Sequence, residues 1–183
     1  MRIYTRAGDD GTTGLYFGGR VRKDDASIAL NGTVDEAQAF LGLARSSAPR
    51  GGPLDELLVT VERDLWVLMA EVATAPDNRR KLVGGKSLVT EEMVARLEGA
   101  IDDLAARTEL PTEFVVPGDD PIAASLDVAR TVVRRAERLA VQWHAEGSLV
   151  PTYLNRLSDL VWAAARWHEG DVHRTTKSPS GDR

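Results

Sequence analysis

LDELLVTVERDLWVLMAEVATA, residues 54–75, is the stretch that most clearly predicts the fold. Its apolar residues recur every three or four positions, so they share one face of an α-helix. That face consists of Leu54, Leu57, Leu58, Val61, Leu65, Leu68, Met69 and Val72. Pro76 follows at once and ends the helix, because proline disfavours a helical conformation in the residue before it. An apolar face of this width needs other helices to cover it.

The same period runs through much of the remaining chain. Asp25 and Thr90 are suited to cap helices at their N-termini, and Asn31–Gly32 is a weak point in the first of these helices. Aromatic residues make up only 5% of the chain, which favours helix over sheet. We therefore expect an all-α fold, a five-helix antiparallel bundle of the ferritin-like type with an ordered N-terminal loop and no convincing strand. The other four helices are expected at residues 26–48, 91–110, 121–146 and 151–168.

A single domain is expected to span residues 1–170, because neither an internal repeat nor a domain boundary interrupts the pattern. Residues 1–23 form its ordered loop, and residues 24–170 form the helix bundle. The basic segment 76–89, between the second and third helices, is expected to be a mobile loop. The polar tail, residues 171–183, is expected to be disordered because it has few apolar side chains to bury.

Composition excludes several classes of function. The chain has no cysteine, so it has neither disulfides nor thiolate metal sites. A net charge of -5 gives no general attraction to nucleic acid. No apolar run approaches the roughly 18 residues of a membrane span, and the N-terminus lacks the apolar core of a signal peptide, so we expect a cytoplasmic protein without membrane partners. His144, His168 and His173 lack metal-ligand spacing with carboxylates, and we predict no metal site.

The N-terminal stretch YTRAGDDGTTG, residues 4–14, has the composition of an anion-binding loop. Its glycines free the backbone to turn N–H groups inward, its threonines add hydroxyl groups, and Arg6 and Lys23 add positive charge. This combination suits a polyphosphate. It matches neither a Walker A motif nor a Rossmann turn, and the alternative is a flexible terminal arm.

A second candidate is ARTVVRRAER, residues 129–138, in the fourth expected helix. Arg130, Arg134 and Arg138 are four residues apart and share one face, with Arg135 just beside that row. Like charges stacked in this way repel one another, so an anionic ligand or a carboxylate of a partner would stabilise them. The alternative is an ordinary solvated basic face.

A third candidate is YLNRLSDLVW, residues 153–162, where Asn155, Asp159 and Trp162 share one face of the fifth expected helix. Polar groups near a bundle core need hydrogen-bond partners, although capping and surface hydrogen bonds are an alternative explanation.

Phe114 precedes a Pro-Gly turn, and a phenylalanine in that position is most often part of the core.

Taken together, these segments resemble the PduO-type ATP:cob(I)alamin adenosyltransferases. The similarity runs from residue 3 to about residue 168 through YTRAGDDGTTGL, VRKDD, GTVDEAQAFLGLA, ARTVVRRAER and LNRLSDLVW, in that order. EVATAP and VTEEMVARLEGAID resemble the connecting helices of the family. The resemblance implies a homotrimer with sites between subunits. It also implies transfer of the 5′-deoxyadenosyl group of ATP to the cobalt of a reduced corrinoid, with release of triphosphate.

The resemblance also implies roles for individual residues. One subunit would bind ATP through Thr5, Arg6, Ala7, Gly8, Thr13, Gly14 and Lys23. Its neighbour would complete the site with Arg134, Arg135, Ala136, Glu137, Arg138 and Asn155. Asp35 would pair with Arg130 across the subunit interface. Phe114 would press on the lower face of the corrin of cobalamin, with Trp162 close by.

The implied reaction needs no protein base, because cob(I)alamin is itself a strong nucleophile that attacks C5′ of the ribose. Arg134, Lys23 and Mg²⁺ carried with ATP would stabilise the departing triphosphate. Phe114 would favour four-coordinate cobalt(II), which eases its last one-electron reduction. The implied partners are a reductase that donates the electron and an enzyme that uses adenosylcobalamin.

Three positions depart from the usual pattern of the family, which often has glycine, histidine and phenylalanine where this chain has Asp119, Asp127 and Trp162. Two alternatives to an enzyme stay open. One is a non-catalytic sensor or carrier that binds ATP or cobalamin. The other is a structural helical bundle, which does not explain why glycine, threonine, arginine and lysine are concentrated in the first 23 residues.

Overall fold

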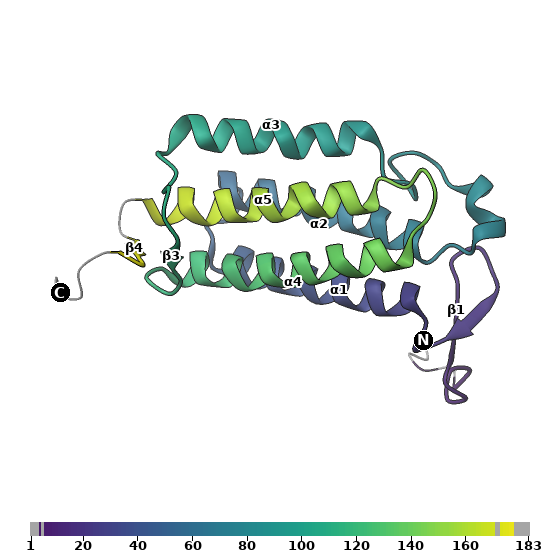
Figure 1. The fold of residues 1–183 in the computed structure, drawn as a ribbon. Helices are drawn as coiled ribbons and strands as arrows, with labels where there is room; N and C mark the ends of the chain where they lie inside the picture. Colours follow the sequence, from purple (N-terminus) through teal and green to yellow (C-terminus); the bar gives the residue numbers. More distant parts are fainter. Residues whose placement is uncertain (1–3, 5, 171–172, 178–183) are drawn as a thin grey trace.

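Five antiparallel α-helices form the body of the protein in the computed structural model, which describes residues 4, 6–170 and 173–177 (Figure 1). The helices are α1 (Ala26–Ser47), α2 (Pro53–Val72), α3 (Glu91–Arg107), α4 (Pro121–Trp143) and α5 (Val150–Glu169). α4 packs against both α1 and α5, while α3 covers α5 and α2 lies against α1. The predicted fold class, an all-α five-helix bundle, is therefore confirmed.

The core forms where the apolar period of the sequence places it. The predicted face of α2 is buried at Leu54, Leu58, Val61, Leu65, Leu68 and Val72. Several buried positions of α4 and α5 are alanine, and small side chains allow helix axes to approach closely. Each helix keeps a polar face as well. Among the described residues, no helix combines the length and the apolar character that a membrane crossing requires.

Several details of the helices differ from the predicted ones. α1 is continuous through Asn31–Gly32, and the side-chain amide of Asn31 donates to the carbonyl of Met69 on α2 at 3.2 Å. α4 ends at Trp143 rather than at residue 146, because His144 adopts a φ of 35°, outside the right-handed helical region. α3 stops three residues before its predicted end.

The basic segment between α2 and α3 is not the mobile loop that its composition predicts. It begins with the 3-10 helix η1 (Pro76–Lys81) and closes around the completely buried side chain of Glu71. One carboxylate oxygen of Glu71 accepts hydrogen bonds from Arg79 at 2.9 Å and from Ser148 at 2.6 Å. The other oxygen accepts the backbone N–H of Val89 at 2.8 Å. This carboxylate joins α2, η1, the following loop and the link between α4 and α5.

Two pairs of short antiparallel strands occur where no strand was predicted. β1 (Thr12–Gly14) pairs with β2 (Arg20–Arg22) in the N-terminal segment. β3 (Val115–Val116) pairs with β4 (Arg174–Thr175) at the opposite end of the bundle (Figure 1). Strands of two or three residues are too short to show an alternating pattern in the sequence.

The polar C-terminal segment is ordered in part. Arg174 and Thr175 pair with β3, within the range 171–183 where a disordered tail is predicted. Charged side chains of this segment find partners in the loop before α4, as Lys177 does with Glu113 at 2.9 Å. Composition could not reveal this pairing, because the partners are far apart in the sequence. The rest of the predicted tail lies outside the described residues.

Replacing Glu71 by glutamine is expected to lower the free energy of unfolding by about 3 kcal/mol, because an amide nitrogen cannot accept the buried hydrogen bonds of the carboxylate. Equilibrium denaturation measures this change. Glu109→Gln, at an exposed position, is the control and should change stability by less than about 0.5 kcal/mol. Equally small effects in the two variants would show that Glu71 does not hold this end of the bundle together.

Candidate functional site

The glycine-rich N-terminal segment folds as a hairpin that places Lys23 just before α1. Thr12 of β1 lies opposite Arg22 of β2, and the backbone N–H of Lys23 donates to the carbonyl of Gly11 at 2.9 Å. Gly8 packs against the side chain of Lys23. A Cβ atom at Gly8 would lie 3.4 Å from Nζ of Lys23 and 3.0 Å from the carbonyl oxygen of Thr12. Glycine at this position therefore permits a close approach that a side chain would hinder.

Arg20 and Asp10 shape this loop, and neither was predicted from the sequence. The Arg20 guanidinium donates to the carbonyl of Ala7 and, through Nε at 2.9 Å, to the hydroxyl of Thr12. Asp10 accepts the backbone N–H of Thr12 at 2.9 Å and its hydroxyl at 2.8 Å. These two donors, with a smaller contribution from Arg20, hold the pKa of Asp10 below its ordinary value. A lone arginine and a lone aspartate carry no spacing signal that would have identified them.

Two cations of the hairpin are left for an external anion. Within the described part of the chain, the ammonium group of Lys23 has no hydrogen-bond or ion-pair partner. Arg6 is exposed and lies over the ring of Tyr4, 5.6 Å from its centroid. Positive φ angles at Arg6 (61°) and Gly11 (82°) bend the backbone tightly. Successive turns of this kind can direct N–H groups to one side, as anion-binding loops require.

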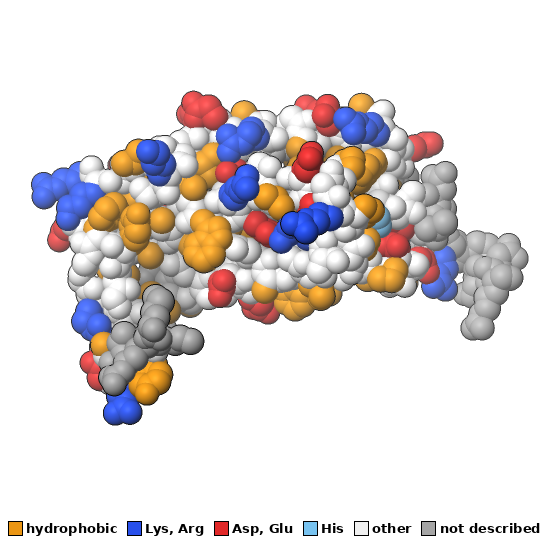
Figure 2. Space-filling model, turned by 180° about the vertical axis from the view of Figure 1, so that it is seen from behind, with side chains coloured by type: hydrophobic (Ala, Val, Ile, Leu, Met, Phe, Trp, Pro, Cys, Tyr) orange, Lys and Arg blue, Asp and Glu red, His pale blue; other side chains and the backbone are white. Residues whose placement is uncertain are grey.

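The other predicted ATP ligands of this segment lie beside the same loop. Thr13 and Gly14 belong to β1, and Ala7 is held by Arg20. Thr5 lies outside the described residues. Figure 2 shows basic side chains at the end of the molecule that carries the hairpin and η1.

The arginine row on α4 is partly neutralised within the chain. Arg130 contacts Asp127, one turn earlier on the same helix, at 3.2 Å. Arg135 forms an ion pair with Glu36 of α1. Carboxylates of the protein itself therefore relieve part of the predicted repulsion. Arg130 and Arg135 are consequently less available to a ligand than their spacing alone indicates.

Arg134 and Arg138 are more available. Both side chains are exposed; Arg134 lies 3.7 Å from Glu137, and Arg138 donates to the carbonyl of Arg134 at 3.1 Å. Glu137 also accepts a hydrogen bond from the side-chain amide of Asn155 on α5 at 3.0 Å. The structure thus brings the predicted polar residues of α4 and α5 together on one surface.

Two other predicted residues differ in their exposure. Ala136 is completely buried, so its methyl group packs in the core and not on the arginine surface. Asp35 is exposed on α1, and Arg130 is paired with Asp127 instead of with Asp35 of the same chain. The contact between Asp35 and Arg130 was predicted across a subunit interface, so it stays a prediction.

The two aromatic residues predicted to face the corrin lie on the surface. Phe114 is 84% exposed, so the interpretation of this residue as part of the core is wrong. Trp162 is half-buried and lines a cavity of about 440 Å³ between α3 and α5, together with Asp159, Glu98 and Arg156.

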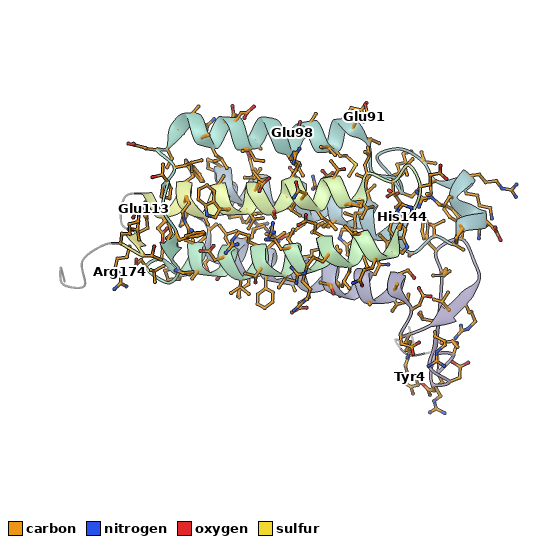
Figure 3. The ribbon with its side chains drawn as sticks, viewed as in Figure 1. Tyr4, Glu91, Glu98, Glu113, His144 and Arg174 are labelled. Atoms are coloured by element: carbon orange, nitrogen blue, oxygen red, sulfur yellow. The ribbon has the colours of Figure 1, made fainter. Side chains whose placement is uncertain are left out.

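No single chain brings the predicted site residues together. The N-terminal hairpin and the β3 strand that follows Phe114 lie at opposite ends of the bundle, as do the labelled residues Tyr4 and Arg174 (Figures 1 and 3). Arg135 meets Glu36 ten residues into α1, which places this pair about 15 Å along the axis from the start of that helix, where Lys23 lies. Arg134 is similarly about 20 Å along α4 from the end near Phe114.

No resident metal centre is evident in the described residues, since nowhere do three or more histidine, aspartate or glutamate side chains converge as metal ligands would.

The bundle, the hairpin and the arginine surface define an all-α protein with exposed cations on the hairpin and on α4. The chain belongs to the cobalamin adenosyltransferase family, whose sequence profile matches residues 3–168. The family predicted from the sequence motifs is thereby confirmed.

Individual relatives agree with this assignment. The chain is 41% identical to a corrinoid adenosyltransferase of Mycobacterium tuberculosis H37Rv, with all of this chain and 95% of the relative aligned. It is 37% identical to one from Bacillus subtilis, over 91% of this chain and 86% of the relative. A PduO-type ATP:corrinoid adenosyltransferase from Lactobacillus reuteri, a phenylalanine-to-alanine variant complexed with cobalamin and ATP, is 32% identical, with a TM-score of 0.80 over 91% of this chain and 93% of the other.

Arg20→Gln is expected to loosen the hairpin, because Ala7 and Thr12 lose hydrogen bonds from the guanidinium. Amide hydrogen exchange should be roughly fivefold to tenfold faster in residues 11–14, while the exchange of α2 should stay the same. Arg63→Gln, which removes an exposed arginine from α2, is the matched control. Unchanged exchange in the hairpin of Arg20→Gln would mean that backbone pairing alone shapes the loop.

Proposed function

We propose that this protein transfers the 5′-deoxyadenosyl group of ATP to the cobalt of cob(I)alamin, giving adenosylcobalamin and triphosphate. The observation that carries the proposal is the placement of Lys23. Its ammonium group is unpaired within the described residues and packs against Gly8 in a loop suited to a polyphosphate. Family membership adds direct support, since the Lactobacillus reuteri relative is complexed with both cobalamin and ATP.

ATP binds between two subunits in this proposal. The hairpin of one subunit holds the triphosphate through Lys23, Arg6 and the backbone around Gly8. The exposed Arg134 and Arg138 of a neighbour approach the same phosphates. The separation of these groups within one chain supports such sharing, because one triphosphate does not reach from the start of α1 to the middle of α4. Repeating this head-to-tail contact around a closed ring gives a homotrimer.

The reaction is a nucleophilic substitution at C5′ of the ribose. Cobalt(I) supplies the electron pair of the new cobalt–carbon bond, and the bond between C5′ and the triphosphate oxygen breaks. The triphosphate leaves with the electrons of that bond, and cobalt becomes formally cobalt(III). Lys23 and Arg134 stabilise the charge that develops on the leaving group, and Mg²⁺ enters as the counter-ion of ATP.

Phe114 acts on the corrin in this scheme. Its exposed ring offers an apolar surface where water or another ligand would otherwise reach the lower face of cobalt. A cobalt(II) that lacks this ligand is easier to reduce by one electron. The electron comes from a reductase, and the product passes to an enzyme that uses adenosylcobalamin; both partners, like a cytoplasmic location, are part of the proposal.

An anaerobic assay with ATP and chemically reduced cob(I)alamin tests the function. We expect the spectrum of cob(I)alamin to decay to that of a light-sensitive alkylcobalamin only when protein and ATP are both present. Binding of ATP without this decay would favour a non-catalytic sensor or carrier. Binding of neither substrate would leave only a structural bundle.

Lys23→Ala and Arg134→Ala are each expected to raise the KM for ATP by tenfold or more, an order-of-magnitude effect of losing a charged phosphate contact. Circular dichroism and sedimentation should stay unchanged. If the site is shared between subunits, co-expressing the two variants should restore about a quarter of the wild-type sites. The Arg134→Ala subunit supplies an intact hairpin and the Lys23→Ala subunit an intact arginine surface. Random assembly brings these two halves together in one case out of four. A mixture with no more activity than its components would place both residues in a single chain's site.

Phe114→Ala is expected to slow turnover that starts from cob(II)alamin and a reductant more than turnover that starts from preformed cob(I)alamin. The reason is that the ring matters for the reduction and not for the substitution. Val83→Ala, at an exposed apolar position in the loop before α3, is the control. Equal losses from both starting materials would show that Phe114 does not act on the cobalt(II) state.

A further inference from the structure

The C-terminal strand β4 lies directly against the segment that carries Phe114. Val115 and Val116 of β3 pair with Thr175 and Arg174, and the backbone N–H of Thr176 donates to the carbonyl of Phe114 itself at 2.9 Å. A two-stranded ribbon of this length is marginal in water without further contacts. Side-chain interactions must therefore hold β4 in place.

Asp119 is the main anchor of β4. Its carboxylate accepts the backbone N–H of Arg174 at 2.9 Å and the guanidinium Nε of the same residue at 2.9 Å. These interactions with Arg174 hold the pKa of Asp119 below its ordinary value. The next residue, Asp120, caps α4 by accepting the N–H of Ala123 at 2.8 Å. The anchor is thus attached to the rigid start of a long helix.

Glu113 supplies a second anchor on the other side of Phe114. It accepts the hydroxyl of Thr175 at 2.9 Å and forms an ion pair with Lys177 at 2.9 Å. Figure 3 shows Glu113 and Arg174 close together at the end of the bundle that carries β3 and β4. Carboxylates before and after Phe114 therefore both bind the same short strand.

Because Phe114 is exposed, the orientation of its ring depends on the strand beside it. At 84% exposure, the ring gains little fixation from packing within its own chain. The direction of the ring therefore depends on the backbone at residues 114–116, which β4 fixes. We propose that β4, locked by Arg174 on Asp119 and by Lys177 on Glu113, is the element that positions Phe114 for the corrin.

This inference rests on the proposed function, and it assigns a positioning role to residues that lie outside the ATP and arginine surfaces. It also assigns a role to Asp119, which is to anchor β4. Asp119 lies in the turn between β3 and α4, and Arg174 in the C-terminal segment of the same chain supplies its cation.

The test compares Arg174→Gln, which removes the cation, with Arg174→Lys, which keeps it. Arg107→Gln is the matched control, because Arg107 forms an exposed ion pair with Asp103 on α3. Two quantities are measured on the full chain. One is amide exchange at Thr176, and the other is the ratio of turnover from cob(II)alamin with reductant to turnover from preformed cob(I)alamin.

We expect Arg174→Gln to speed exchange at Thr176 by roughly fivefold to tenfold and to lower the turnover ratio by about threefold or more. Arg174→Lys should give intermediate values, and Arg107→Gln should change neither. Because the side chains of Arg174 and Lys177 are exposed, raising the salt concentration from about 0.05 to 0.5 M should move the wild type toward Arg174→Gln.

Two results would overturn the inference while leaving the proposed function intact. One is unchanged exchange at Thr176 in Arg174→Gln. The other is an unchanged turnover ratio in Arg174→Gln when Phe114→Ala lowers it. If the wild-type protein forms no alkylcobalamin at all, the proposed function fails and the inference fails with it.

Discussion

The buried carboxylate of Glu71 holds together the end of the bundle on which the N-terminal hairpin rests. Its oxygens receive hydrogen bonds from η1, from the loop before α3 and from the link between α4 and α5. Burying a charged carboxylate away from water costs much free energy unless hydrogen-bond donors surround it. The segments that supply these donors must therefore all be in place when Glu71 is buried. The hairpin attaches to the same end, because the N–H of Tyr16 donates to the carbonyl of Ala73 at 3.0 Å. The position of Lys23 therefore depends on Glu71, a residue whose side chain is completely buried.

The carboxylates of Asp127 and Asp119 both have cationic partners within the chain. Asp127 is buried and forms an ion pair with the equally buried Arg166 at 2.8 Å, while it also contacts Arg130. Arg166 lies 3.0 Å from Glu169, and burial raises the pKa of that carboxyl group above its ordinary value. Asp119 has Arg174 as its partner. The cations that pair with Asp127 and Asp119 thus lie 39 and 55 residues away from them in the sequence.

In the proposed reaction, the two ends of the bundle bind different substrates. One end offers cations and backbone groups to a triphosphate, and the other offers an exposed aromatic ring to a corrin. Helices of about 30 Å keep these ends apart within one chain, so neighbouring subunits are what can bring them together. In this proposal the five-helix core serves as a spacer between the two kinds of surface. The loop near the N-terminus would then be fixed on one side by the bundle and on the other by a neighbouring subunit.

The sequence by itself determined the helices and the family, and it supplied the contact residues that the proposal uses. Periodic apolar positions such as those of α2 are a local signal, and burial requires them wherever the helix packs. The glycines, Lys23 and the arginine row were identified because several residues of one chemical type recur within a few positions. Only the tertiary structure decided that Arg20 and Asp10 shape the loop, that Arg135 is already paired with Glu36, and that a polar tail forms β4. These outcomes depend on which charged groups meet across the fold, and an ion pair between distant residues leaves no periodic trace in the sequence.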